Sequence, residues 1–262
     1  MMLIDRLGLY IINLLEECGR AILFFTESLS LVFSKPSRFS EIIKHMEFIG
    51  NKSVLIIMLT SAFTGMALSF QIYIGFSMVN ATNLVGPTVA MGISKELGPV
   101  LTGLIVAARA GGAMAARLGT MRVSEQIDAL EVMGINPKQY LVAPRLIAAF
   151  LTLPLLCGVF DFVAMLGSYI FSVQLLGLDE AIYFDKISQW ISTRDVMEGL
   201  IKAAVFGVIF SMVSTYVGYH TKGGAKGVGD ATNKGVVNSM VLIIIFNFIL
   251  TNIFRFFFLI SR

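Results

Sequence analysis

The sequence has few charged residues. Asp, Glu, Lys and Arg make up 14% of its 262 residues, whereas about a quarter is usual in soluble domains. Hydrophobic residues make up 56% and include 21 Phe and 14 Met, which is more than a soluble core can bury. The composition therefore excludes a soluble domain and predicts an integral membrane protein. The net charge of +3 comes from basic residues scattered around the apolar runs, and this scatter argues against nucleic-acid binding because no basic stripe forms.

Cysteine and histidine are scarce as well. Cys18 and Cys157 are the only cysteines and lie far apart in apolar surroundings, which gives no support to a disulfide framework. The only histidines, His45 and His220, are too few for a metal cluster or a catalytic triad. The glycines of TKGGAKGVGD at 221–230 lack the spacing of a GxxxxGKS/T nucleotide loop and are expected to form a flexible loop. We therefore expect no enzyme activity, and no metal or cofactor bound by this chain.

Long uncharged runs predict an all-α integral membrane protein with five transmembrane helices. No charged residue occurs between Lys52 and Lys95, a run that holds one crossing of roughly 20 residues, a turn at 80–87 and the start of a second crossing. The second crossing is expected to end near Arg117. Three further crossings are expected at about 146–178, 203–221 and 235–254.

An amphipathic pattern precedes these crossings. Apolar residues between positions 7 and 25 share one helical face, and the acidic residues of the same segment fall elsewhere, which describes an elbow helix lying in the membrane interface. We expect a single domain over 1–262, with an interfacial helical region at 1–50 and a five-span bundle at 53–258.

The distribution of Lys and Arg predicts the orientation. With a cytoplasmic N-terminus, the segments on the cytoplasmic side carry 13 basic residues and those on the other side carry 4. Basic residues accumulate on the cytoplasmic side of membrane proteins. We therefore expect a cytoplasmic N-terminus, an extracytoplasmic C-terminus and, for a bacterial protein, the inner membrane.

The segment RLGTMRVSEQIDALEVMGINP at 117–137 predicts a short cytoplasmic helix between the second and third crossings. Ser124 is expected to be its N-cap, and Gly134 followed by Pro137 is expected to end it.

This short helix has two faces. Its apolar stripe consists of Ile127, Leu130 and Met133. Its acidic stripe consists of Glu125, Asp128 and Glu131. An ordinary loop helix that packs on its own bundle is one interpretation. Because the polar face is acidic rather than basic, contact with a cytoplasmic protein is favoured over contact with lipid headgroups. These six residues are the predicted docking residues.

Small residues repeat every four positions in the second crossing, at Ala107, Gly111, Ala115 and Gly119. Such a face lets another helix approach closely. The spacing does not distinguish packing within one chain from packing across a dimer, and both interpretations stay open.

The region 95–156 resembles the MlaE-type (YrbE-like) permeases, which are membrane subunits of ABC transporters that work with MCE proteins in lipid trafficking. The resemblance is carried by KELGPV, the AxRxG core, GTMRVSEQIDAL, MGINP and the RLxA…LPLL continuation, and it extends more loosely over the whole chain. The segment 117–137 resembles the coupling helix of that family.

The resemblance implies partners and a substrate. It implies a homodimer of this chain, a cytoplasmic ABC ATPase dimer that holds ATP and Mg, an extracytoplasmic MCE-domain protein and, in some systems, a small STAS-domain protein. The substrate implied is a membrane lipid, in the first place a phospholipid.

Charged residues within the second crossing are candidates for the lipid pathway. Lys95 and Glu96 lie near its far side, before the break at Gly98 and Pro99. They are expected either to line a substrate mouth or to form a mutual or interhelical ion pair. Asp161, in the third crossing, is expected to be a structural polar contact. Acyl chains are expected to contact the first crossing at Met66, Phe70 and Tyr73.

A secondary transporter or channel that works without an ATPase is the alternative function. It fits poorly, because five crossings with no visible internal repeat are unlike the repeated halves of such transporters. A membrane-anchored scaffold is a further alternative, but it would not need the charges of Lys95 and Glu96.

Overall fold

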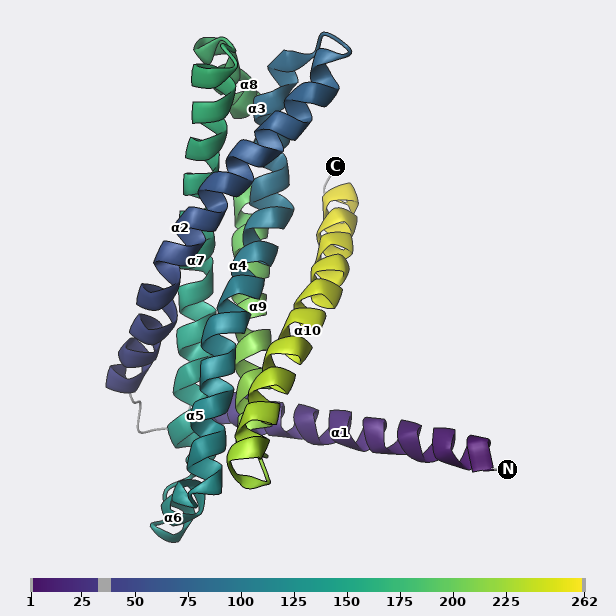
Figure 1. Cartoon of the computed structure of the whole chain (residues 1–262), viewed down its shortest axis with the longest axis vertical. Helices are drawn as coiled ribbons and strands as arrows, with labels where there is room; N and C mark the ends of the chain where they lie inside the picture. The colour runs from purple at the N-terminus through teal and green to yellow at the C-terminus, as the bar shows by residue number, and fades with distance from the viewer. Residues whose placement is uncertain (1, 33–38, 261–262) are drawn as a thin grey trace.

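The computed structural model of the chain describes residues 2–32 and 39–260, and all regular elements in these ranges are helices (Figure 1). Five helical stretches are long and apolar enough to cross a membrane: Phe39–Ser77, Thr82–Val123, Lys138–Leu175, Thr193–Tyr219 and Gly224–Phe256. The predicted all-α fold with five transmembrane helices is confirmed. Of the predicted interfacial region at 1–50, residues 1 and 33–38 lie outside the described residues.

The crossings are built from the following elements. The first is α2 (Phe39–Ser77), and the second comprises η1 (Thr82–Leu84), α3 (Val85–Gly92), η2 (Ile93–Leu97), α4 (Gly98–Val106), η3 (Ala107–Gly111) and α5 (Gly112–Val123). After the short helix α6 (Gln126–Val132), the third comprises η4 (Lys138–Val142), α7 (Ala143–Tyr169) and η5 (Ile170–Leu175). The helix α8 (Glu180–Trp190) precedes the last two crossings, α9 (Thr193–Tyr219) and α10 (Gly224–Ile260). The segments η2 to η5 are wide π-helical turns.

Two predicted loops are shorter than expected. The segment at 221–230 is not a flexible loop, because Gly223 and Gly224 make the turn with φ of 90° and 64° and the helix α10 starts at once. The turn predicted at 80–87 is centred on Asn80, which has a φ of 54°. Pro87 already belongs to the first turn of α3, where a missing backbone N–H is tolerated.

The helix α1 (Met2–Val32) runs across the foot of the bundle and projects to one side (Figure 1). It is attached through Phe24, which is buried against Val142 and Leu146 of the third crossing and lies 5.4–5.5 Å from the rings of Tyr216 and Tyr219. Its position in the membrane interface stays a prediction.

The tightest packing joins α2 to α7. The buried residues of α2 recur every fourth position and are mostly small: Ile49, Ser53, Ile57, Ser61, Gly65 and Ser69. A Cβ on Gly65 would lie 1.9 Å from the carbonyl oxygen of Ala164, and a Cβ on Gly167 would lie 2.4 Å from that of Ala62. The two backbones therefore touch, which only small residues permit.

A buried chain of hydroxyl groups continues this contact to α8. Ser69 donates a hydrogen bond of 2.6 Å to Ser168, whose hydroxyl is 2.9 Å from that of Tyr183. Burial raises the pKa of the Tyr183 phenol. The hydrogen bonds fix α8 to the end of the bundle opposite α6 (Figure 1).

Candidate functional site

The turn η2 carries Lys95 and Glu96 and is wider than an α-helix. The N–H of Gly98 donates to the carbonyl of Ile93, five residues earlier. Pro99 has no N–H and so cannot donate to the carbonyl of Lys95, four residues earlier. The carbonyl oxygen of Lys95 accepts a hydrogen bond of 2.9 Å from Nζ of Lys202 on α9. The KELGP sequence thus provides a backbone carbonyl, that of Lys95, as hydrogen-bond acceptor for Lys202, which is distant in the chain.

Lys202 is the centre of a buried polar cluster. Its side chain is fully buried and lies 2.9 Å from Oε1 of Glu96 and 3.3 Å from Oε1 of Glu198. It also donates to the hydroxyl of Thr251 at 3.0 Å. The second oxygen of Glu96 accepts from the amide of Asn247 at 2.8 Å. The cluster therefore joins η2, α9 and α10, and it compensates the charges that would be costly in a membrane.

Lys95 makes separate contacts with the start of α9. Its Nζ lies 2.6 Å from Asp195 and 3.8 Å from Glu198. Asp195 also accepts hydrogen bonds from the backbone N–H and the hydroxyl of Ser192, at 2.7 and 2.9 Å, in a capping box at the start of α9. Lys95 and Glu96 do not pair with each other. Each of them pairs with a residue of α9 instead, so the ion pairs are interhelical, which is one of the expected arrangements.

Two glycines let the neighbouring helices reach η2. A Cβ on Gly199 would lie 2.0 Å from the carbonyl oxygen of Ser94, so α9 can approach only because that position is glycine. On the opposite side, a Cβ on Gly98 would lie 2.0 Å from Oδ1 of Asp161 on α7. The thiol of Cys157 is 3.9 Å from the other oxygen of Asp161. Asp161 therefore makes one weak polar contact, and its Oδ1 is buried next to Gly98 without a hydrogen-bond partner among the described residues.

The expected acyl-chain residues do not meet this cluster within the chain. Met66, Phe70 and Tyr73 lie on α2, where the ring of Phe70 makes an edge contact with Phe171 at 5.5 Å. Glu96 instead turns towards α9 and α10. The expected combination of a charged end and an apolar groove is therefore not a single cavity of one chain.

The sequence predictions missed the partners of Lys95 and Glu96, which are Asp195, Glu198, Lys202, Asn247 and Thr251. The predicted fourth crossing begins at 203, one residue too late to include Lys202 as a membrane charge. The spacing of four between Glu198 and Lys202 was the available signal, because it places an acid and a base on one helical face.

The short helix between the second and third crossings is α6. Ser124 is not its N-cap, because α5 continues to Val123 and the Ser124 hydroxyl bonds back to the carbonyl of Thr120 at 2.8 Å. Glu125 takes the N-cap position in the left-handed region, with a φ of 58°. Gly134, with a φ of 75°, ends the helix as expected.

The apolar stripe of α6 faces largely inward. Ile127 is fully buried against Leu118 and Leu141, and Leu130 packs on the same cluster. Ile127 is therefore covered by its own bundle in this conformation, whereas Leu130 is only partly buried; their role in docking stays a prediction. Met133 is 65% exposed and the neighbouring Val132, which was not predicted, is 89% exposed.

The acidic stripe of α6 is partly paired within the chain. Asp128 forms an ion pair with Arg122 of α5, and Glu131 accepts a hydrogen bond of 3.3 Å from the hydroxyl of Tyr219. Glu125 is exposed. At this end of the bundle α6 reaches beyond the level of α1 (Figure 1).

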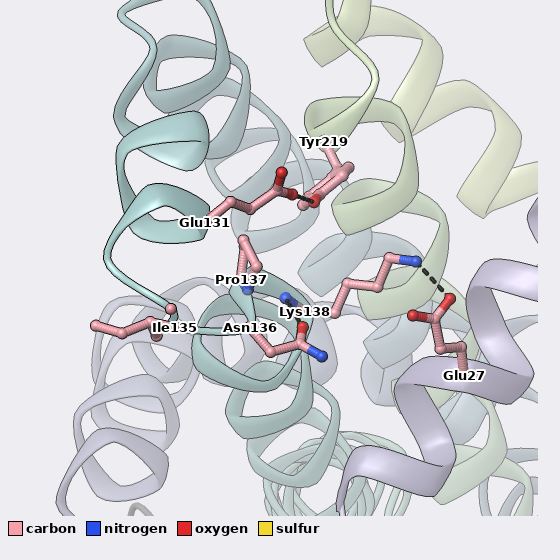
Figure 2. A pocket seen from close by; sticks show the side chains of 8 residues that line it. Glu27, Glu131, Ile135, Asn136, Pro137, Lys138 and Tyr219 are labelled. Carbon is pink, nitrogen blue, oxygen red and sulfur yellow. Dashed lines mark hydrogen bonds and ion pairs between the residues drawn. The ribbon is translucent and has the colours of Figure 1, made fainter.

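A cavity of about 410 Å³ that is wide open to the surface lies beside α6. It is lined by Glu27 of α1, by Glu131, by the linker Gly134, Ile135, Asn136 and Pro137, by Lys138 and by Tyr219 (Figure 2). Lys138 forms an ion pair with Glu27, which ties α1 to the start of the third crossing.

The small-residue face of the second crossing packs within the chain. A Cβ on Gly111 would lie 2.7 Å from Oγ of Ser214, and one on Gly119 would lie 3.0 Å from Oγ1 of Thr221. Ala107 and Ala115 are fully buried. The structure therefore shows packing of this face within one chain, which was one of the two interpretations that the spacing left open.

Among the residues that the structure describes, no three His, Cys, Asp or Glu side chains gather as a possible metal site.

Comparisons with known proteins cover almost the whole chain. The model of the family "Permease MlaE" matches residues 42–253. A protein of Rickettsia prowazekii (strain Madrid E) named "Probable ABC transporter permease protein" is 41% identical over 247 residues, which are 94% of this chain and 95% of that protein. The Arabidopsis thaliana chloroplastic protein TRIGALACTOSYLDIACYLGLYCEROL 1 is 41% identical over 212 residues, 81% of this chain and 61% of that protein. The Haemophilus influenzae protein named "Intermembrane phospholipid transport system permease protein MlaE" is 32% identical over 254 residues, 95% of this chain and 96% of that protein.

Proposed function

The chain belongs to the MlaE permease family and is an ABC transporter permease, and from this premise we propose that it moves phospholipids between the bacterial inner membrane and an MCE-domain protein. It acts as a homodimer, with its N-terminus in the cytoplasm and its C-terminus outside, and a cytoplasmic ATPase dimer supplies the energy from ATP and Mg. The proposal also allows a STAS-domain protein as a further subunit. As a permease the chain is a transport component and not a catalyst, and the ATPase-independent alternative has no support in the family.

The observation that carries this proposal is the construction of α6. The helix is fixed to its own bundle by the buried Ile127 and by the Arg122–Asp128 pair, yet it presents Val132 and Met133 to water. Exposed apolar side chains beyond the membrane are typical of a protein contact. A short helix held rigidly between two long ones can pass the movement of a closing ATPase to the membrane part.

The lipid pathway belongs to the same proposal. The side chain of Glu96 is 40% exposed although it lies in a membrane crossing, so it is open to a lipid headgroup. Lys95 and Glu96 would meet the headgroup, and Met66, Phe70 and Tyr73 of α2 would contact acyl chains along the surface of the bundle. The name of the Haemophilus relative, with its phospholipid transport system, supports this choice of substrate.

Co-purification tests the proposal. The tagged chain, extracted from its native membranes, should bring with it an ABC ATPase and an MCE-domain protein, and the complex in liposomes should move a fluorescent phospholipid only with ATP. Replacing Val132 and Met133 by Asp should remove the ATPase, because two charges enter an apolar contact. Val79→Asp, at a 69% exposed position at the opposite end of the bundle, is the matched control and should keep it. Recovery of the wild-type chain without any ATPase contradicts the proposal.

A further inference from the structure

Four basic side chains gather near the end of the bundle that carries α6 (Figure 1). Arg109 and Arg117 belong to the second crossing, Lys52 to α2 and Arg145 to α7. On α2, Lys52 is the last charged residue before the uncharged stretch 53–77. Basic side chains at the end of an apolar stretch lie at the level of the lipid headgroups. This group of cations is separate from the Lys202 cluster and has no part in the mechanism above.

One aromatic ring brings two of these cations together. The Cζ atoms of Arg109 and Arg117 lie 5.0 and 5.4 Å from the centre of the Phe48 ring on α2, so the two positive charges are no further apart than the sum of these distances. Contacts with a ring hold a guanidinium in place but do not neutralise its charge. Lys52 is exposed and follows Phe48 by one helical turn, on the same face of α2.

The two guanidinium groups keep unused hydrogen-bond donors. Nη1 of Arg109 donates to the carbonyls of Phe48 and Ile49 at 2.8 and 3.3 Å and to the hydroxyl of Ser53 at 3.0 Å. Among the described residues, the other nitrogens of Arg109 have no hydrogen-bond partner, and Arg117 has only its contact with the ring. Because a guanidinium carries five N–H donors, both groups can bind a further acceptor.

A third arginine adds positive charge from the interior. Arg145 is only 5% exposed and donates a hydrogen bond to the carbonyl of Leu141, one turn earlier. It is close enough to Arg117 for the two positive charges to repel each other. Buried charges in a membrane crossing normally have an ionic partner. Within the described part of the chain, neither of these two arginines forms an ion pair.

The acids nearby do not balance the cations. Glu41 attracts Arg145 but is committed to Lys44, whose Nζ lies 2.7 Å from it. Glu47 is exposed and lies about 200° around α2 from the buried Ile49, on the opposite side of the helix. The group of cations therefore lacks an anion, at a level where lipid phosphates are abundant.

We propose that Arg117, Lys52 and Arg109 bind the phosphate group of an anionic phospholipid in the leaflet at this end of the bundle. A guanidinium matches a phosphate in shape and charge, and Arg145 strengthens the positive potential. An anionic lipid is favoured over a zwitterionic one, because the cation of a zwitterionic headgroup would meet the same positive charges. The site lies away from Lys95 and Glu96 and does not depend on the proposed transport function.

Lipid retention by neutral variants tests the site. The purified full-length permease is equilibrated with phosphatidylglycerol, phosphatidylcholine and diacylglycerol that carry the same acyl chains, and the retained lipids are counted by native mass spectrometry. The wild type should prefer phosphatidylglycerol. The double variant Lys52→Gln with Arg117→Gln should bind it about twentyfold more weakly, because each cation near a lipid surface contributes about 1 kcal/mol. Retention of diacylglycerol should not change.

Lys226→Gln is the matched control. Lys226 is an exposed lysine at the start of α10, at the same end of the bundle, and forms no ion pair with any described residue. Its replacement should change the binding of phosphatidylglycerol less than about twofold. An equal loss in the control and in the double variant overturns the inference, because the attraction would then be general. Equal retention of phosphatidylglycerol and phosphatidylcholine by the wild type overturns it as well.

A photoreactive lipid locates the site. Phosphatidylglycerol with a diazirine in its headgroup, added to nanodiscs that hold the permease, should label α2 near Lys52 or α5 near Arg117. Inorganic phosphate in large excess, at constant ionic strength, should not prevent this labelling. Labelling of other segments only overturns the inference, and loss of labelling with inorganic phosphate would identify a free anion as the occupant and overturn the assignment to a lipid.

Discussion

The cluster around Lys202 and the tip around α6 are both rich in charge, but they satisfy it differently. Lys202 is fully buried and touches two carboxylates, a hydroxyl and a carbonyl of its own chain. At the tip, the side chains of Arg122 and Asp128 form a pair while staying 36% and 50% exposed. A membrane crossing must compensate its charges internally because lipid cannot solvate them. At the tip water can do so, which leaves charges available for a partner.

The largest effect is expected from breaking the cluster. Lys202→Met leaves Glu96 and Glu198 without their shared cation and should lower the free energy of unfolding by about 3 kcal/mol. This value is at the lower end of the range for a broken buried ion pair, because Glu96 is partly exposed. Denaturation in mixed micelles measures this change. Adding Glu96→Gln to Lys202→Met should recover part of the loss. If Lys202→Met alone were as stable as the wild type, the charges of the cluster would have to be solvated in some other way.

A smaller effect is expected from separating the helices that build the cluster. Gly199→Ala places a methyl group 2.0 Å from the carbonyl oxygen of Ser94, so α9 must move away from η2 and the unfolding free energy should fall by about 1–3 kcal/mol. Gly158→Ala is the matched control, because a Cβ on that helical glycine of α7 would meet nothing within 4 Å. The control should be neutral or slightly stabilising. Equal stability of the two variants would show that α9 does not approach η2 this closely.

The fold could be predicted from the sequence because hydrophobic runs report the membrane crossings directly. The ends of the helices could not, since polar residues continue a helix once it leaves the lipid. The predicted loop at 221–230 illustrates this, because Gly223 and Gly224 complete the turn and the remaining polar residues belong to α10. Ser124 illustrates a second limit: the same hydroxyl can cap the following helix or bond back to the preceding one, and only the path of the chain decides which.

The charged residues of the site could be predicted from the sequence, but the residues with which they pair could not. Lys95 and Glu96 stand out as charges in an apolar crossing, whereas their partners are about 100 to 155 positions away in the chain, a separation that no spacing rule covers. Which of the predicted docking residues are exposed could be predicted only in part, because a helical stripe such as Ile127, Leu130 and Met133 does not reveal whether the chain itself covers it. The structure divides this stripe between the core and the surface.

The smallest effect is expected at the tip, in the permease without its ATPase. Arg122→Gln removes the partner of Asp128, but the freed carboxylate remains in water, so the free energy of unfolding should fall by no more than about 1 kcal/mol. Raising the salt concentration should shrink the difference further, because salt screens exposed pairs. The same denaturation series that contains Lys202→Met provides the measurement. If Arg122→Gln destabilised the isolated permease as much as Lys202→Met does, the tip would be a buried ionic core like the cluster, and α6 would have no charge to offer a partner.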